Sequence, residues 1–111
     1  MLKDQIMNQL GALFGDVTYW IKNSTYNWDE IGARFHHRLV SIHAFANGNG
    51  RHARLMTDIL LEINDQKPFS WGIKSNADPI EIESTTRNSY VSALKAADAG
   101  NFEPLLQFVR S

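Results

Sequence analysis

The sequence has no cysteine among its 111 residues, so disulfides, thiolate metal sites and cysteine nucleophiles are excluded. It also lacks long apolar runs: the longest, such as residues 59–61, fall far short of the roughly 20 residues that span a bilayer. The first residues lack the apolar core of a signal peptide. We therefore expect a cytoplasmic protein that makes no use of a membrane.

An excess of charge of either sign is also missing. Eleven Lys and Arg residues stand against twelve Asp and Glu residues, which leaves a formal net charge of −1. Such a balance provides no general attraction to nucleic acid, and no segment has the basic character of a DNA recognition helix. We expect no nucleic-acid partner, and any phosphate binding must come from a local group of residues.

Hydrophobic periodicity predicts an all-α fold of five helices with short joints. The first three helices are expected at about residues 2–23, 29–43 and 51–64. Each has an apolar stripe that would face the core. The predicted stripes are Leu10, Leu13, Val17 and Ile21 in the first helix, Ile31, Phe35, Leu39 and Ile42 in the second, and Leu55, Ile59 and Leu60 or Ile63 in the third.

The C-terminal third has clear start and stop signals. The loop after the third helix is expected to include a short extended piece at residues 69–71. Asp78 can cap the fourth helix and Pro79 suits its first position, while Gly100 suits its C-terminal cap. A short fifth helix is expected at residues 102–109.

The informative stretch is residues 43–54, which read His-Ala-Phe-Ala-Asn-Gly-Asn-Gly-Arg-His-Ala-Arg. Gly48 and Gly50 allow positive φ, so the backbone there can turn its N–H groups inward into an anion-binding nest. The nest leads into a helix N-terminus, which also attracts anions. Arg51 and Arg54 share that first turn, although positive charge there costs about 0.3–1 kcal/mol per residue. A bound di- or triphosphate explains this placement.

His43 stands beside the nest, where a neutral imidazole can take a proton from an incoming nucleophile. The loop is not a Walker A loop, since no Gly-Lys-Ser/Thr follows the glycines, and no strand precedes it as in a dinucleotide fingerprint. A zinc site built from the four histidines is disfavoured, because His36 and His43 are two helical turns apart and no acidic partner recurs at ligand spacing. His36 and His37 are interpreted as structural or surface groups.

The same stretch resembles the motif of the Fic (Fic/Doc) family, His-Pro-Phe-x-(Asp/Glu)-Gly-Asn-Gly-Arg-x-x-Arg, at all specified positions but two. The resemblance extends over roughly residues 29–109. More narrowly, Asn47 and His52 resemble the bacterial subgroup called mobile mystery protein B. The resemblance implies a compact all-α, Fic-like domain with a helix, an anion-binding loop and a helix at its core.

It also implies a function, the transfer of AMP from ATP to a Tyr, Thr or Ser hydroxyl of a target protein. His43 would be the general base, with Asn49 and Arg51 completing the catalytic set. Phosphate contacts would come from the rest of the loop and the following helix. The implied nucleotide-binding residues are Asn47, Gly48, Asn49, Gly50, Arg51 and Arg54, of which Arg54 would reach the γ-phosphate.

Two residues depart from the family motif. Ala44 replaces the proline, and Asn47 replaces the acidic residue that binds Mg²⁺ in the family. An amide oxygen is a weaker, neutral ligand for Mg²⁺, which would then be held mainly by the phosphates. Two alternatives therefore stay open: a Fic-fold enzyme that transfers phosphate or another nucleotide, and an inactive nucleotide-binding module.

Family members are usually restrained by an inhibitory helix with the pattern Ser/Thr-x-x-x-Glu-Gly/Asn. No glutamate of this sequence is followed by Gly or Asn. The resemblance thus implies that inhibition comes from an N-terminal region or from a separate, antitoxin-like partner. We expect residues 1–111 to be a single catalytic core that lacks an N-terminal portion of a longer protein.

Overall fold

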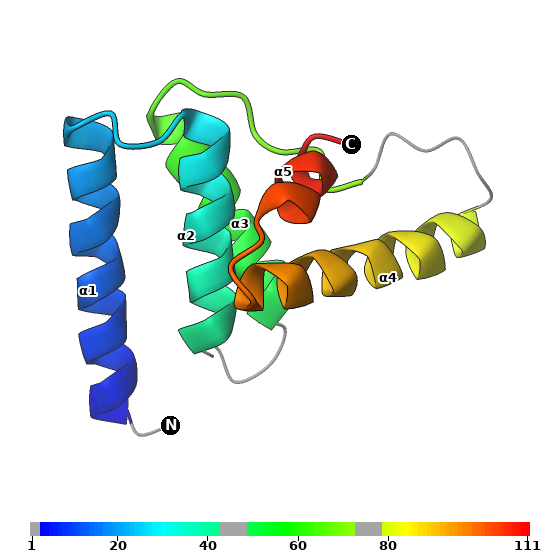
Figure 1. The fold of residues 1–111 in the computed structure, drawn as a ribbon, viewed down its shortest axis with the longest axis horizontal. Helices are drawn as coiled ribbons and strands as arrows, with labels where there is room; N and C mark the ends of the chain where they lie inside the picture. The colour runs from blue at the N-terminus through cyan, green and yellow to red at the C-terminus, as the bar shows by residue number, and fades with distance from the viewer. Residues whose placement is uncertain (1–2, 43–48, 73–78) are drawn as a thin grey trace. The chain divides into compact units, whose positions relative to one another are not determined.

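The structure is a computed structural model that describes residues 3–42, 49–72 and 79–111, and within these ranges it contains helices and no strands (Figure 1). This confirms the predicted all-α fold. The helices are α1 (Lys3–Lys22), α2 (Trp28–Ile42), α3 (Asn49–Ile63), α4 (Pro79–Asp98) and α5 (Glu103–Val109). The chain divides into two compact units, residues 1–68 and 69–111, which are described separately.

In the first unit, α2 packs against both α1 and α3. Its buried residues form the centre of a core cluster to which α1 contributes a single stripe. The predicted stripes of the first two helices are confirmed. The buried members of this cluster are Leu13, Val17, Ile31, Phe35, Leu39, Ile42 and Ala53, with Leu10 and Ile21 partly buried against them.

A capped turn joins α1 to α2. The side-chain oxygen of Asn27 accepts a hydrogen bond from the backbone N–H of Glu30 at 2.9 Å, which satisfies one of the unpaired donors of the first helical turn. Beside it, the rings of Trp20 and Tyr26 meet edge to face with centroids 5.4 Å apart, and the guanidinium of Arg34 lies 4.4 Å from the centre of the Tyr26 ring. These contacts fix where α2 begins, one residue before the predicted start.

The predicted stripe of α3 is wrong at Leu55 and Ile59, whereas Leu60, one of its two options for the last position, is partly buried against the core. Leu55 and Ile59 are 58% and 43% exposed, whereas Ala53, Thr57 and Leu61 are fully buried. The buried positions recur every four residues, as the helical period requires. Ala53 and Thr57 are small, so they are buried because α3 packs closely against its neighbour and not because they are strongly hydrophobic. Hydrophobicity alone favours the bulkier stripe of Leu55 and Ile59, which is exposed.

In the second unit, α4 and α5 pack together, and the residues that precede α4 are tied to the end of α5. The backbone N–H groups of Ser70 and Trp71 both donate to the carbonyl of Val109, at 2.9 and 3.2 Å. Trp71 has a φ of 53° and Gly72 a φ of 77°. The predicted extended piece at 69–71 is therefore wrong at Trp71, which lies in the left-handed region and turns the chain.

The ends of α4 agree with the sequence signals that the structure describes. The helix begins at Pro79 as predicted, while Asp78 lies outside the described residues. Gly100 has a φ of 90°, and its N–H donates to the carbonyl of Ala97 at 2.9 Å, while Asn101 donates to Ala96 at the same distance. These two bonds satisfy carbonyls of the last helical turn, so the predicted glycine cap is confirmed.

Gly72 is expected to be the least replaceable glycine of the second unit. A β-carbon at this position would lie 2.9 Å from Cγ2 of Thr86 and 3.0 Å from Cε1 of Phe108. Gly72→Ala combines the left-handed strain of about 1–2 kcal/mol with an overpacking cost of about 1–3 kcal/mol. Urea denaturation should show this sum as a lower free energy of unfolding.

Gly100→Ala is the matched control for this substitution. Gly100 also has positive φ, but nothing lies within 4 Å of an added β-carbon. The control should lose only the strain of about 1–2 kcal/mol. Equal losses for the two variants would show that the contacts of Gly72 with Thr86 and Phe108 do not restrict this position.

Candidate functional site

The two predicted phosphate-binding arginines lie at the start of α3. Arg51 is exposed and Arg54 is half-buried, while Ala53 between them is fully buried in the core of the first unit. Residues three apart are neighbours on a helix surface, so both guanidinium groups extend from one side of the same turn. The core contact of Ala53 therefore fixes the backbone from which both positive charges project.

The N-terminus of α3 supports anion binding through its backbone. The helix begins at Asn49, two residues before the predicted start at about residue 51. Gly50 is thus a helical residue and does not form part of a nest through a positive φ. Its N–H group belongs to the first helical turn and has no acceptor within the helix. This first turn contains no acidic residue, so the positive end of the helix dipole is not compensated by a carboxylate there.

The other predicted site residues fall outside what the structure describes. His43, Asn47 and Gly48 lie in the segment 43–48, and the side chain of Asn49 is likewise outside the described set. The structure brings together Gly50, Arg51 and Arg54 on one helix end. The convergence of all these residues on one pocket stays a prediction.

A buried polar contact joins α2 to α3 directly below this turn. His36 and Thr57 are both 0% exposed, and Oγ1 of Thr57 lies 3.4 Å from Nδ1 of His36. The same hydroxyl donates to the carbonyl of Ala53 at 2.7 Å. The interpretation of His36 as a structural group is confirmed, whereas Thr57 was not among the predicted core or site residues. The available signal was its spacing of four residues from both Ala53 and Leu61.

Burial keeps His36 neutral. Loss of hydration is the main cause that lowers the pKa of His36 from 6.5 to about 4. A hydrogen bond with the backbone of Ala53 acts in the opposite direction, and the positive charge of Arg54 and the neighbouring His37 lower the pKa further. At neutral pH the imidazole is therefore uncharged, and it adds no charge beside Arg54.

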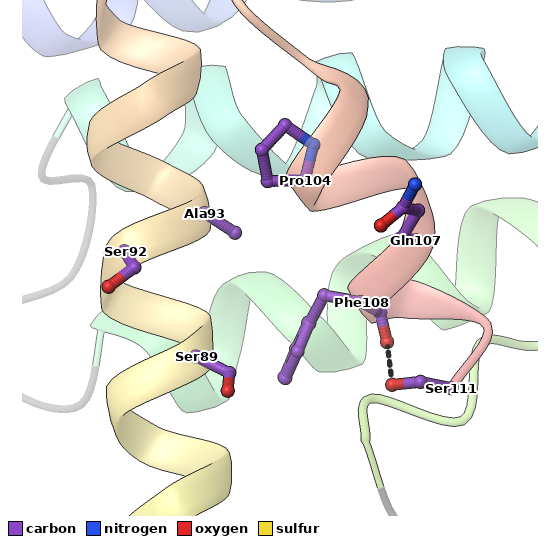
Figure 2. Close-up of a pocket in the computed structure, with 7 residues that line it drawn as sticks. All are labelled: Ser89, Ser92, Ala93, Pro104, Gln107, Phe108 and Ser111. Atoms are coloured by element: carbon purple, nitrogen blue, oxygen red, sulfur yellow. Dashed lines mark hydrogen bonds between the residues drawn. The ribbon is translucent and has the colours of Figure 1, made fainter.

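A shallow hollow of about 440 Å³ lies between α4 and α5 in the second unit (Figure 2). The described residues that line it are Ser89, Ser92, Ala93, Pro104, Gln107, Phe108 and Ser111, which combine hydroxyl and amide groups with apolar side chains. None of these described lining residues is charged, and none is a predicted site residue, so they give no support for phosphate binding here.

The tryptophans that the structure describes take part in packing. Trp20 and Trp28 are partly buried against the core of the first unit. In the second unit, the ring of Trp71 meets Phe69 edge to face at 5.2 Å. Packing accounts for all three, as is usual for tryptophan.

The described residues provide neither a cluster of metal ligands nor a membrane-spanning helix. Within ranges 3–42, 49–72 and 79–111, no three His, Asp or Glu side chains are placed to share a metal ion. None of the helices in these ranges has both the length and the apolar character needed to cross a membrane.

Comparison with known proteins identifies relatives of this chain. The model of the Fic/DOC family matches residues 2–61, which include the whole stretch 43–54. Protein adenylyltransferase fic-1 of Caenorhabditis elegans is 29% identical over 109 residues, which cover 96% of this chain and 18% of the relative. Protein adenylyltransferase Fic of Drosophila yakuba is 32% identical over 87 residues, covering 78% of this chain and 15% of the relative.

A third relative is similar in extent. Protein adenylyltransferase Fic of Aedes aegypti is 31% identical over 80 residues, which cover 72% of this chain and 14% of the relative. The chain thus spans less than a fifth of the length of these curated relatives. No solved structure matches it significantly. These relatives are animal proteins, and the narrower resemblance to a bacterial subgroup stays a prediction.

The buried histidine makes the stability of the fold depend on pH. Because the pKa of His36 is lower in the folded chain than the ordinary 6.5, the unfolded chain binds a proton more readily. The stabilisation is therefore complete above pH 6.5, is lost as the pH falls toward 4, and changes no further below that. Over this interval His36 should account for a loss of roughly 3 kcal/mol of unfolding free energy.

His36→Asn isolates this contribution, since it does not titrate and every other ionisable group is retained. Urea denaturation of both proteins at a series of pH values should give curves that diverge between pH 6.5 and 4, with the wild type losing more stability. Parallel curves would contradict the burial of a neutral imidazole.

Proposed function

We propose, from the premise that this chain belongs to the Fic/DOC family, that it is the catalytic core of a protein adenylyltransferase. The observation that carries the proposal is the first turn of α3, which contains no acidic residue and from which Arg51 and Arg54 project beside the helix N-terminus. The names of the relatives, protein adenylyltransferases, supply the reaction. The substrate is ATP, and the acceptor is a Tyr, Thr or Ser hydroxyl of a target protein.

The proposed reaction is an in-line displacement at the α-phosphorus of ATP. The acceptor oxygen forms a bond to this phosphorus, the bond to the bridging oxygen breaks, and pyrophosphate leaves. His43 takes the proton of the acceptor hydroxyl. Such a reaction depends mainly on positioning and on charge stabilisation, so a few donors around one base are sufficient.

The phosphate groups would be held by the loop and by α3. Asn49 contacts the α-phosphate, and Gly48 and Gly50 provide backbone N–H groups to the phosphate chain. Arg51 neutralises charge that develops on the phosphates, and Arg54 reaches the γ-phosphate. The half-buried position of Arg54 favours this role, because a partly desolvated guanidinium binds phosphate more strongly than a fully hydrated one.

The donor set does not fit a Mg²⁺ ion held by protein carboxylates. The first turn of α3 contains no acidic residue, and the sequence from His43 to Arg54 contains none either. Asn47 offers one neutral amide oxygen, a weak ligand for a hard cation. We propose that Mg²⁺ accompanies ATP on its own phosphate oxygens, and no step is assigned to the metal.

The partners follow from the same proposal. The chain acts on a separate target protein. Because no glutamate of this sequence has the context of the family's inhibitory helix, we propose that the inhibitory element lies outside this sequence, either in an N-terminal region or on an antitoxin-like partner. The absence of cysteine suits a cytoplasmic protein.

A second candidate function is a nucleotide-binding module without activity, favoured by Ala44 and Asn47 at the two positions that depart from the motif. Transfer of phosphate or of another nucleotide by the same fold is a third. All three share the phosphate site and differ in the bond that is broken.

Arg54→Ala should weaken the binding of ATP more than that of AMP, because AMP has no γ-phosphate. The expected loss for ATP is that of a charge-assisted contact, on the order of 1.5–3 kcal/mol. Calorimetric titration of each nucleotide measures it. Arg38→Ala, which removes the same charge from an arginine of α2 paired with Asp16, is the matched control and should change neither affinity. Equal losses for ATP and AMP would show that Arg54 does not face the γ-phosphate.

His43→Ala should separate binding from transfer. It removes the proton acceptor but leaves the backbone donors and both arginines, so ATP should bind about as tightly. Transfer of label from α-labelled ATP to proteins of a cell lysate should fall by about 10²–10⁴-fold, as is typical for the loss of a general base. An unchanged rate of transfer would contradict the role of His43.

The same assay distinguishes the candidate functions. Label from α-labelled ATP identifies nucleotide transfer, and label from γ-labelled ATP identifies phosphate transfer. If the wild type labels nothing and Asn47→Asp restores labelling, the missing carboxylate accounts for the inactivity. If both proteins bind ATP and neither labels a protein, the chain is a binding module.

A further inference from the structure

Two fully buried polar side chains connect α2 and α3 within the described part of the first unit, His36 and Thr57. Burying polar groups is unfavourable unless they are hydrogen-bonded, and an apolar pair of similar size is often at least as stabilising. Stability alone therefore does not explain the pair. Its distinguishing property is directional: hydrogen bonds require one arrangement of the two helices, whereas apolar contacts allow several.

The direction of the contact follows from the hydroxyl of Thr57. This hydroxyl has one proton, which it donates to the carbonyl of Ala53 at 2.7 Å. Its oxygen can then only accept from Nδ1 of His36, 3.4 Å away. The neutral imidazole thus has its proton on Nδ1, facing α3. A hydrogen bond with the backbone of Ala53 links the imidazole to the same turn.

The carbonyl of Ala53 belongs to the peptide group whose nitrogen is that of Arg54. Holding this peptide sets the rotation of the first turns of α3 about the helix axis. Given a helix radius of about 5–6 Å with side chains, a rotation of roughly 20° moves a side-chain end by about 2 Å. A misplacement of about 1 Å is enough to lower a rate by about 10²-fold.

We infer that His36 and Thr57 are a positioning pair that holds the first turns of α3 in one rotational setting against α2 and so directs Arg51 and Arg54 toward the nucleotide phosphates. The inference rests on the proposed function, since it needs a phosphate ligand at this helix end. Neither member of the pair touches the nucleotide.

Four substitutions test the pair in matched couples. His36→Leu fills the space without a donor, whereas His36→Asn keeps an N–H group near the position of Nδ1. Thr57→Val removes the hydroxyl at constant shape, whereas Thr57→Ser keeps it. Dissociation constants of ATP and AMP are measured for each variant by calorimetry at pH 7 without urea. Urea denaturation curves of the same variants show which of them are folded under these conditions.

His36→Leu and Thr57→Val should each weaken ATP binding about tenfold, which corresponds to about 1.4 kcal/mol, and weaken AMP binding much less. His36→Asn and Thr57→Ser should bind ATP within about threefold of the wild type, a difference of well under 1 kcal/mol. The double variant His36→Leu/Thr57→Val should bind ATP no more weakly than whichever single variant binds it less tightly, since both substitutions break the same contact.

A purely structural role predicts otherwise. If His36→Leu and Thr57→Val lower stability but leave ATP affinity unchanged while Arg54→Ala weakens it, the positioning role is wrong and the nucleotide site stands. If Arg54→Ala itself leaves ATP binding unchanged, the proposed nucleotide site fails and the positioning role fails with it. Should His36→Leu not fold, the comparison of Thr57→Val with Thr57→Ser decides the question alone.

Discussion

The first unit depends on the burial of α2 from two sides. Its buried residues occupy more than one face of the helix, because α1 and α3 both pack against it (Figure 1). α1 needs only one apolar stripe to meet this surface, and α3 meets it through Ala53 and Thr57, which are small enough to bring the backbones close. The positions of both arginines follow from this contact, since they flank the residue that makes it. The fold and the candidate site therefore share one helix interface.

The sequence predicted much of this arrangement, and its failures have a common physical cause. The stripes of α1 and α2 were predicted correctly because each contains bulky apolar residues with a single consistent period. In α3 two stripes of the same period overlap, one through Leu55 and Ile59 and the other through Ala53 and Thr57. Hydrophobicity selects the first, but close packing selects the second. Which of the two stripes is buried depends on how closely the neighbouring helix packs. The residues of the two stripes do not determine that distance.

The candidate site shows the same division between chemistry and geometry. The motif from His43 to Arg54 predicts phosphate binding from residue types and spacing, and the structure places Arg51 and Arg54 at a helix start, while the phosphate site itself stays a prediction. The helix starts two residues earlier than predicted and includes Gly50, because a glycine that permits positive φ does not require it. His36 was interpreted as structural, but its partner Thr57 could not be foreseen: a buried hydrogen bond between residues 21 apart in sequence depends on the packing of two helices.

Because the buried Ala53 lies between two arginines, neighbouring positions of α3 differ in the substitutions that they tolerate. Arg51 is exposed, so a lineage can replace it while the helix interface stays intact. Ala53 is fully buried, so a larger residue at this position would push α3 away from α2 and would displace both arginines. Loss of the proposed phosphate contact of Arg51 therefore takes one substitution that leaves the helix packing intact, whereas a change in the packing at Ala53 moves both arginines together.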